Sequence, residues 1–195
     1  MTRKRKFFID YNAPVTLTFA LICLLVLGLG YYTGNMSTRA FFMTYNSSWF
    51  NPLTYVRMFT YVFGHANWDH FIGNMMYILI LGPMIEEKYG SKKLMKMIAI
   101  TAGVGGFLNN ILFPNVMLCG ASGIVFMMII LASATSFETG QVPLTLILVL
   151  IIYLGGEVYS ALYVDDNVSQ LAHIVGGVCG AFFGLYNVSY HKEPI

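Results

Sequence analysis

The chain has 195 residues, of which 57% are hydrophobic and only 10% are charged, and its mean hydropathy is +0.66. A soluble domain carries roughly 25% charged residues, so this composition excludes a water-soluble globular protein and indicates an integral membrane protein. The formal net charge of +2 is small, and we predict no nucleic-acid partner.

The first apolar run extends from Val15 to Tyr32 and follows a short basic segment. The run is long for the apolar region of a signal peptide, and no small-x-small cleavage site follows it. We therefore expect a retained transmembrane helix, preceded by a tail at residues 1–12. Residues 34–64 are rich in aromatic residues and are interrupted by glycine, asparagine and proline. Such segments favour the membrane interface, so we expect a partly submerged loop with short helices here.

Five further transmembrane helices are expected after this loop. A charged turn at residues 86–96 ends the second helix, and the uncharged run at residues 97–137 is too long for one span of about 20 residues. The expected spans are Asn67–Ile85, a third helix from Met97 to the break at Pro114, Ser122–Phe137, Val142–Gly156 and Leu171–Tyr190. We thus predict an all-α polytopic membrane protein with six transmembrane helices in one bundle over residues 13–190, followed by a tail at 191–195.

The basic residues predict the orientation of these spans. Six spans place both termini on one side, and nine basic residues fall on that side. Only Arg39 and Arg57 fall on the other side. Because Lys and Arg concentrate in cytoplasmic loops, we expect a multi-pass protein of the cell membrane whose N and C termini are both cytoplasmic.

With this topology, the second, fourth and sixth helices run inward, and polar residues lie near the outer end of each. These residues are His70, Asn74, Ser122 and His173. A serine in a membrane helix usually bonds to the backbone or a neighbouring helix, but an intramembrane histidine is a functional candidate by default. Together, a serine and a histidine can act as nucleophile and base. For His65, which lies about 140° from His70 around a helix, we expect a structural role.

The fourth helix is short for a membrane span. Its 16 residues rise about 24 Å, against a hydrocarbon core of roughly 30 Å, so its outer end should be recessed. The loop from Pro114 to Gly120 should then dip into the membrane, where irregular backbone must be buried in protein or line a wet cavity.

Glycines predict how the fourth and sixth helices meet. Gly176, Gly180 and Gly184 recur every four residues and form a smooth strip on the sixth helix. Small residues at this spacing let helices approach closely, and Gly123 is a fitting counterpart on the fourth helix. Close packing would carry Ser122 towards the histidine of the sixth helix.

Together these motifs resemble those of the rhomboid intramembrane serine proteases. They are Gly-Ala-Ser-Gly at 120–123, His-x4-His-x3-Asn at 65–74, Ala-His-x2-Gly-x3-Gly at 172–180, the Arg57 region, and the run Glu-Glu-Lys-Tyr-Gly-Ser at 86–91. The resemblance covers residues 15–190 and is closest to the minimal six-helix bacterial form. It implies an endopeptidase of the lipid bilayer that cleaves transmembrane protein substrates near the outer face, with no cofactor and no metal.

The resemblance also implies roles for individual residues. Ser122 and His173 would form a catalytic dyad; the oxyanion and substrate would be bound by His70, Asn74, Gly120 and the backbone of Ser122. The fifth helix and the loop at residues 157–170 would be the gate and the cap. Two positions depart from the family pattern: Val56 replaces a frequent tryptophan, and Phe126 replaces a tyrosine that packs on the catalytic histidine in some members.

Three alternatives remain open from the sequence. The first is a non-catalytic rhomboid-like protein that binds membrane proteins for quality control. The second is a metal-dependent protease using His65, His70 and His173, although the chain has no His-Glu-x-x-His motif. The third is a small channel or transporter with polar residues along a pore.

Overall fold

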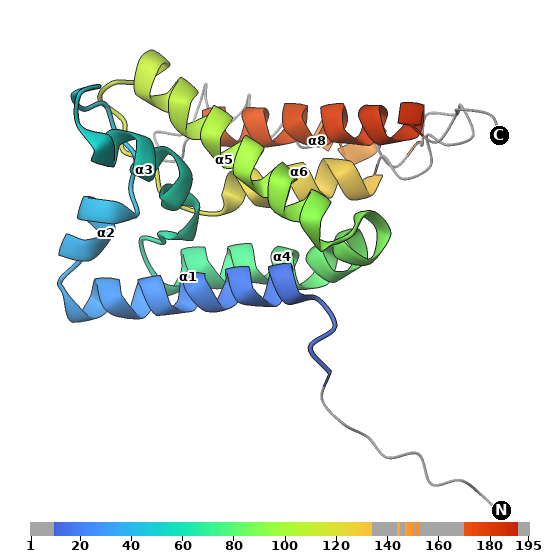
Figure 1. Cartoon of the computed structure of the whole chain (residues 1–195), viewed down its shortest axis with the longest axis horizontal. Coiled ribbons are helices and arrows are strands. Elements are labelled where there is room, and N and C mark those ends of the chain that lie inside the picture. Colours follow the sequence, from blue (N-terminus) through green and yellow to red (C-terminus); the bar gives the residue numbers. More distant parts are fainter. Residues whose placement is uncertain (1–9, 134–143, 145–146, 150, 153–169, 191–195) are drawn as a thin grey trace, which may run out of the picture.

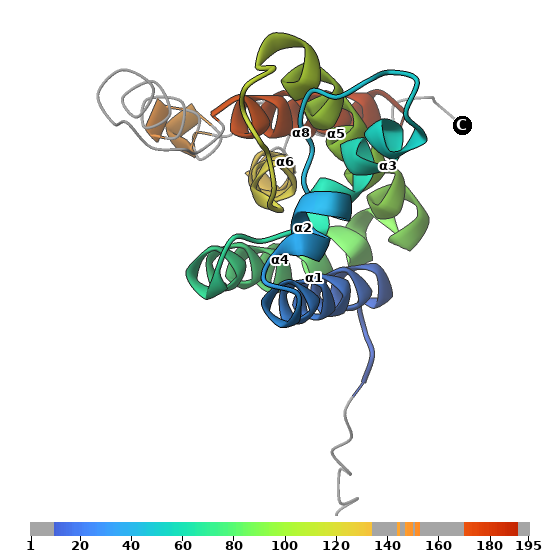
Figure 2. The ribbon, with the colours of Figure 1, turned by 90° about the vertical axis from the view of Figure 1, so that its left-hand side faces the viewer.

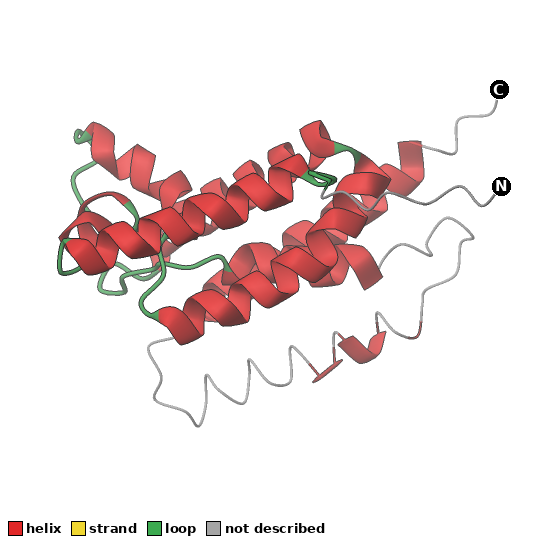
Figure 3. Ribbon diagram, turned by 90° about the horizontal axis from the view of Figure 1, so that it is seen from below, coloured by secondary structure: helices red, strands yellow, loops and turns green. Residues whose placement is uncertain are grey.

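The computed structural model describes residues 10–133, 144, 147–149, 151–152 and 170–190. The regular elements of these described residues are all helices joined by loops, and none of them is a β-strand (Figure 3). The elements are α1 (Pro14–Tyr32), α2 (Met36–Phe41), α3 (Pro52–Thr60), a 3-10 turn η1 (Tyr61–Phe63), α4 (Trp68–Tyr89), α5 (Ser91–Leu112), α6 (Ser122–Ser133) and α8 (Gln170–Tyr190). The predicted all-α fold is confirmed for the described part of the chain.

Helix α6 lies at the centre of the bundle. It packs most extensively against α8 and also contacts α4 and α5. Figure 1 shows α8 running alongside α6 and α5 crossing obliquely in front of them, and in Figure 2 α6 is seen nearly end-on, with α8 and α5 on one side of it and α4 and α1 on the other. A helix that is apolar all round is a buried helix, and α6 follows this rule, because Ile124, Met127 and Leu131 are all fully buried.

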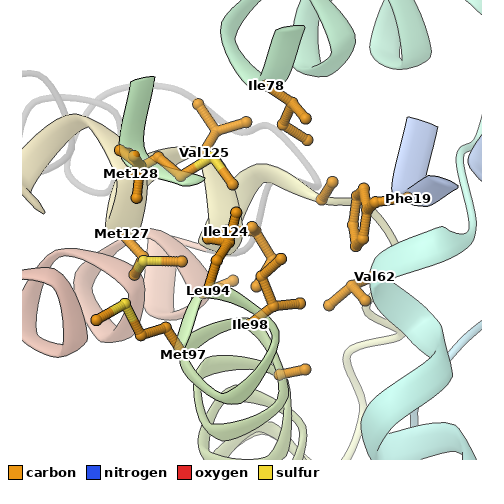
Figure 4. Close-up of a cluster of buried hydrophobic side chains, with 14 of the residues drawn as sticks. Phe19, Val62, Ile78, Leu94, Met97, Ile98, Ile124, Val125, Met127 and Met128 are labelled. Atoms are coloured by element: carbon orange, nitrogen blue, oxygen red, sulfur yellow. The ribbon is translucent and has the colours of Figure 1, made fainter. Parts of the chain in front are cut away.

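The hydrophobic core gathers around this central helix. Figure 4 shows Ile78 of α4 and Leu94 of α5 converging on Ile124 of α6. Phe19 of α1 and Val62 of η1 belong to the same cluster. Contact among five elements holds the beginning of α6 in a fixed position relative to α4 and α5.

Helix α4 continues beyond the end predicted from the sequence. We expected the helix to stop at Ile85 and a charged turn to follow; this was wrong, because α4 runs to Tyr89 and α5 begins at Ser91. The break between them is Gly90, whose φ of +83° favours glycine. The charged residues therefore extend two helices rather than form a long turn.

Glu86 explains why this helix end is buried. Its carboxylate accepts hydrogen bonds from the backbone N–H groups of Val15 and Thr16 at 2.9 and 3.0 Å. It also accepts from the Thr16 hydroxyl at 2.8 Å and from the Ser91 hydroxyl at 2.7 Å. The carboxylate caps the N-terminus of α1, where N–H groups lack intrahelical partners, and joins α1, α4 and α5.

The segment at residues 34–64 forms short helices joined by irregular backbone, as predicted. Arg57 of α3 is buried, and its Nε donates to the carbonyl of Ala40 at 2.8 Å. The Arg57 guanidinium also lies 4.6 Å from the centre of the Tyr45 ring. These contacts fasten α3 to the chain that follows α2.

Two of the described helices, α1 and α5, are long and apolar enough to cross a membrane, while α6 and the described apolar part of α8 are shorter. Helix α4 has Asp69 in its first turn and charges from Glu86 onward, so only its middle is uncharged. The predicted α1 and sixth helix are present as helices, whereas six membrane spans stay a prediction. The predicted fifth helix and the loop at 157–170 fall almost wholly outside the described residues, as do the chain ends at 1–9 and 191–195.

Candidate active site

The loop between α5 and α6 is anchored inside the protein. Thr44 and Leu118 exchange two backbone hydrogen bonds, each 2.9 Å long. The Thr44 hydroxyl donates to Asn110 Oδ1 at 3.0 Å, and Asn109 Nδ2 donates to the carbonyl of Val116 at 3.1 Å. Leu118 and the residue before Ser122 are buried. The end of this irregular segment nearest α6 is thus buried in protein, while its dip into the membrane, beside a water-filled depression at Ser122, stays a prediction.

Gly120 brings this loop against His70. Its φ of +127° is a conformation that L side chains rarely adopt. A Cβ atom at Gly120 would lie 2.6 Å from both Cε1 and Nε2 of the His70 ring. The Gly120 N–H donates to the carbonyl of Tyr61 at 3.0 Å. Gly120 therefore provides room for the imidazole, and its own N–H is already bonded.

Ser122 begins α6 and is half-buried. As the first helical residue, it has a backbone N–H without an intrahelical acceptor, and it lies at the positive end of the helix dipole. The start of α6 can therefore stabilise negative charge that develops beside the Ser122 hydroxyl.

The glycine strip of α8 lies against the first turns of α6, as predicted. A Cβ at Gly176 would overlap the carbonyl oxygen of Gly123, and one at Gly180 would lie 2.5 Å from the carbonyl oxygen of Met127. A Cβ at Gly123 would in turn lie 3.0 Å from the carbonyl oxygen of Ala172. Ser122 precedes Gly123 and His173 follows Ala172, so this backbone contact brings the serine and histidine positions together.

The His173 ring lies over the face of α6 that carries Ser122. It is buried, and its centre is 4.6 Å from the centre of the Phe126 ring at an interplanar angle of 47°. Phe126 is one turn beyond Ser122, so the two share a helix face. Phe126, which replaces the tyrosine found in some members of the rhomboid family, thus still packs on the His173 ring.

Asn74 and His65 both contact His70, the first at its backbone and the second at its ring. Asn74 is buried, and its Nδ2 donates to the carbonyl of His70 at 3.0 Å; a carboxamide has a second N–H to offer. His65 precedes α4, is buried, and packs edge-to-face on His70 with 5.2 Å between ring centres. Its Nδ1 lies 3.2 Å from the carbonyl of Phe63. The other departure, Val56, is exposed on α3.

Sequence reasoning missed the residues that hold the loop. Tyr61 was noted only as one of many aromatic residues, yet its carbonyl accepts the Gly120 N–H. Thr44 and Asn109 were not noted at all. They contribute backbone groups, a hydroxyl and an amide, which no motif marks, so only the long-range contacts could have revealed them.

Within the described ranges, no three His, Cys, Asp or Glu residues are grouped as metal ligands would be. Asp165 and Asp166, the acidic residues that precede His173 most closely in the sequence, lie outside the described residues.

Comparison with known proteins shows where this chain finds its relatives. A family model described as the rhomboid domain matches residues 52–190, a range that contains Ser122 and His173. Rhomboid-related protein 1 of Caenorhabditis elegans is 32% identical over 148 residues, which cover 70% of this chain and 42% of the relative. Rhomboid-like protein 11, chloroplastic, of Arabidopsis thaliana is 28% identical over 131 residues, which cover 66% of this chain and 43% of the relative.

A bacterial relative matches over a longer stretch. Rhomboid protease GlpG of Yersinia pestis is 25% identical over 179 residues, which cover 89% of this chain and 63% of the relative. The chain therefore spans about half the length of the curated relatives that it matches.

Proposed function

Because the chain belongs to the rhomboid family, we propose that it is an intramembrane serine endopeptidase that cleaves transmembrane segments near the outer face of the membrane. One observation carries this proposal. The glycine contact between α6 and α8 sets the positions of Ser122 and His173 together, with the His173 ring over the Ser122 face of α6.

In the proposed reaction, the Ser122 hydroxyl attacks the scissile carbonyl while His173 takes the hydroxyl proton. His173 then returns this proton to the leaving amine, and an acyl-enzyme forms on Ser122. Water hydrolyses the ester in a second attack, with His173 again as the base. Phe126 contributes by holding the imidazole over α6.

The developing oxyanion would be stabilised at the start of α6. The Ser122 N–H and the helix dipole are available there. The His70 ring lies against Gly120, two residues before Ser122, and Asn74, one turn after His70, has a second amide N–H to donate. Removal of one such donor typically costs about 3–4 kcal/mol of transition-state stabilisation. Gly120 assists by admitting the His70 ring, since its own N–H is bonded to Tyr61.

The expected substrate is a single-pass transmembrane helix with Gly or Ala near the outer interface, because the segment must unwind before it can be cut. We propose that it enters sideways past the fifth helix, with the loop at residues 157–170 as a cap. A crosslink between the fifth helix and α4 should then block cleavage of membrane substrates, and unimpaired cleavage would contradict lateral entry.

The decisive experiment incubates purified protein with a fluorogenic transmembrane peptide. Ser122→Ala and His173→Ala should each lower cleavage by roughly 10⁴-fold or more, because the two groups act as a unit. Ser133→Ala is the matched control, since Ser133 lies on the same helix and its hydroxyl bonds to the carbonyl of Ile129. Full activity in either dyad variant would exclude this mechanism.

Labelling with a fluorophosphonate separates the remaining alternatives. A nucleophilic Ser122 should be labelled, and Ser122→Ala should not. If the wild type binds transmembrane segments but is neither labelled nor active, the protein is the non-catalytic binding form. Loss of cleavage with a chelator would favour the metal-dependent protease, and a pure protein that conducts or transports without cleaving would favour the channel.

A further inference from the structure

The side of α5 that faces away from the bundle carries two lysines near the start of the helix and apolar side chains along the rest. Lys92, Lys96, Ile100 and Val104 follow one another at four-residue spacing, and Phe107 continues the same face. All five are exposed, with Ile100, Val104 and Phe107 between 39% and 49% accessible. We call this set the α5 stripe.

Two acidic residues, Glu86 and the exposed Glu87, precede the positive end of the α5 stripe in the chain. Helix α5 contains no Asp or Glu. Glu86, the nearest buried carboxylate, is occupied by the backbone of α1 and by Ser91. Within the part of the chain that the structure describes, neither Lys92 nor Lys96 forms an ion pair with Glu87 or any other acid. Two adjacent ammonium groups thus face outward from the α4–α5 corner.

The apolar end of the stripe is bounded by aromatic rings of the preceding segment. The Phe59 ring packs on α5, where a Cβ at Gly103 would lie 2.8 Å from Phe59 Cε1. The Trp49 ring lies 6.2 Å from the Phe107 ring. Figure 1 shows α5 crossing the front of the bundle, with α3 beside its C-terminal end and the connection from α4 at its N-terminal end.

The dimensions of the stripe match one phospholipid. From Lys96 to Phe107 the helix rises about 16 Å, close to half of the roughly 30 Å hydrocarbon core of a bilayer. A phosphate held by the two lysines would therefore place an acyl chain along Ile100 and Val104 as far as Phe107.

We propose that the α5 stripe is a binding site for an anionic phospholipid of the cytoplasmic leaflet. Lys92 and Lys96 bind the headgroup phosphate, and the apolar residues contact one acyl chain. The proposal relies on the cytoplasmic orientation of the α4–α5 corner that the proposed function assumes, but it does not depend on catalysis.

The test uses the purified full chain in detergent and counts bound lipids by native mass spectrometry. Phosphatidylglycerol is compared with phosphatidylcholine of the same acyl chains. The wild type should prefer phosphatidylglycerol. A lysine near an anionic headgroup strengthens binding about fivefold, so K92Q/K96Q, which removes two lysines, should reduce this preference about 25-fold. K92R/K96R should retain it. R39Q removes an exposed cation from the segment between α1 and α3 and should also retain it.

Two further measurements test whether the acyl chain is needed for binding and whether binding is independent of catalysis. Glycerol phosphate, which has the headgroup charge but no acyl chain, should not displace phosphatidylglycerol at equal concentration. The Ser122→Ala variant should bind the lipid as the wild type does, so loss of proteolysis and loss of lipid binding are separate results. Equal preference for the two lipids in the wild type, or an unchanged preference in a folded K92Q/K96Q variant, would overturn the proposal.

Discussion

At the scale of single residues, the contact between Phe126 and His173 orients the proposed base. An aromatic pair of this kind contributes about 0.5–1.5 kcal/mol beyond burial, which corresponds to at most about a tenfold change in rate. Phe126→Leu should therefore lower kcat/KM by roughly tenfold while the protein stays folded, and Phe126→Tyr should preserve activity. Cleavage of the transmembrane peptide measures both variants.

The control for this prediction is the other departure from the family pattern. Val56 is exposed on α3, so Val56→Ala should leave cleavage unchanged. Equal activity of Phe126→Leu and the wild type would mean that the imidazole is held by its other contacts.

A second residue-scale prediction concerns Gly120. Gly120→Ala would strain the backbone at a φ of +127° and press a methyl group into the His70 ring, so we expect at least a 100-fold loss of cleavage, the scale of one lost oxyanion donor. Gly28→Ala is the matched control, because a Cβ there meets nothing within 4 Å and alanine is the better helix former. Wild-type activity in Gly120→Ala would show that His70 need not lie against this loop.

At the scale of elements, the packing of α8 on α6 sets the distance between the proposed dyad residues. Gly176→Ala would force a methyl group onto the carbonyl of Gly123, which no side-chain rotation can relieve. Overpacking of this kind costs about 1–3 kcal/mol, and the separation of the helices should abolish most of the cleavage activity. Thermal unfolding and peptide cleavage would report the two effects.

The neighbouring glycine offers a control on the same helix. A Cβ at Gly177 would lie 3.8 Å from Cγ1 of Ile130, which is ordinary van der Waals contact. Gly177→Ala should therefore keep both stability and activity. If the two variants behaved alike, the α6–α8 contact would not position the site.

Much of this arrangement could be predicted from local patterns. Apolar runs predicted α1 and α8 because a membrane span must be continuous in sequence. The strip at Gly176 and Gly180 predicted the α6–α8 contact because small residues at this spacing lie on one helix face. These properties depend only on nearby residues.

The contacts that complete the site could not be predicted in this way. The packing of His70 on Gly120 joins two segments about fifty residues apart, and no periodicity encodes it. The end of α4 was also missed, because charge was taken as a sign of solvent exposure, whereas Glu86 is buried by hydrogen bonds to a distant helix. Long-range polar contacts of this kind have no local pattern.

At the scale of the whole molecule, Glu86 connects three helices at the end of the bundle away from Ser122. Its carboxylate accepts from the N-terminus of α1 and from Ser91 at the start of α5. Helix α1 also packs closely on α4, where a Cβ at Gly82 would lie 2.5 Å from Cγ2 of Thr16. The stability of the bundle should therefore depend on this one acidic side chain.

The final prediction compares the two adjacent glutamates. Glu86→Gln keeps the size of the side chain but turns an amide group towards backbone donors, so it should lower the free energy of unfolding by about 2 kcal/mol, the contribution typical of hydrogen bonds to a charged group. Glu87→Gln should change it little, because Glu87 is exposed. Thermal unfolding in detergent measures both. Since the loop before Ser122 packs on His70 near the start of α4, whereas Glu86 lies near the end of α4, Glu86→Gln should cleave peptide normally well below its melting temperature and lose activity only as the bundle unfolds. Equal melting of the two variants would mean that packing alone holds α1 to α4.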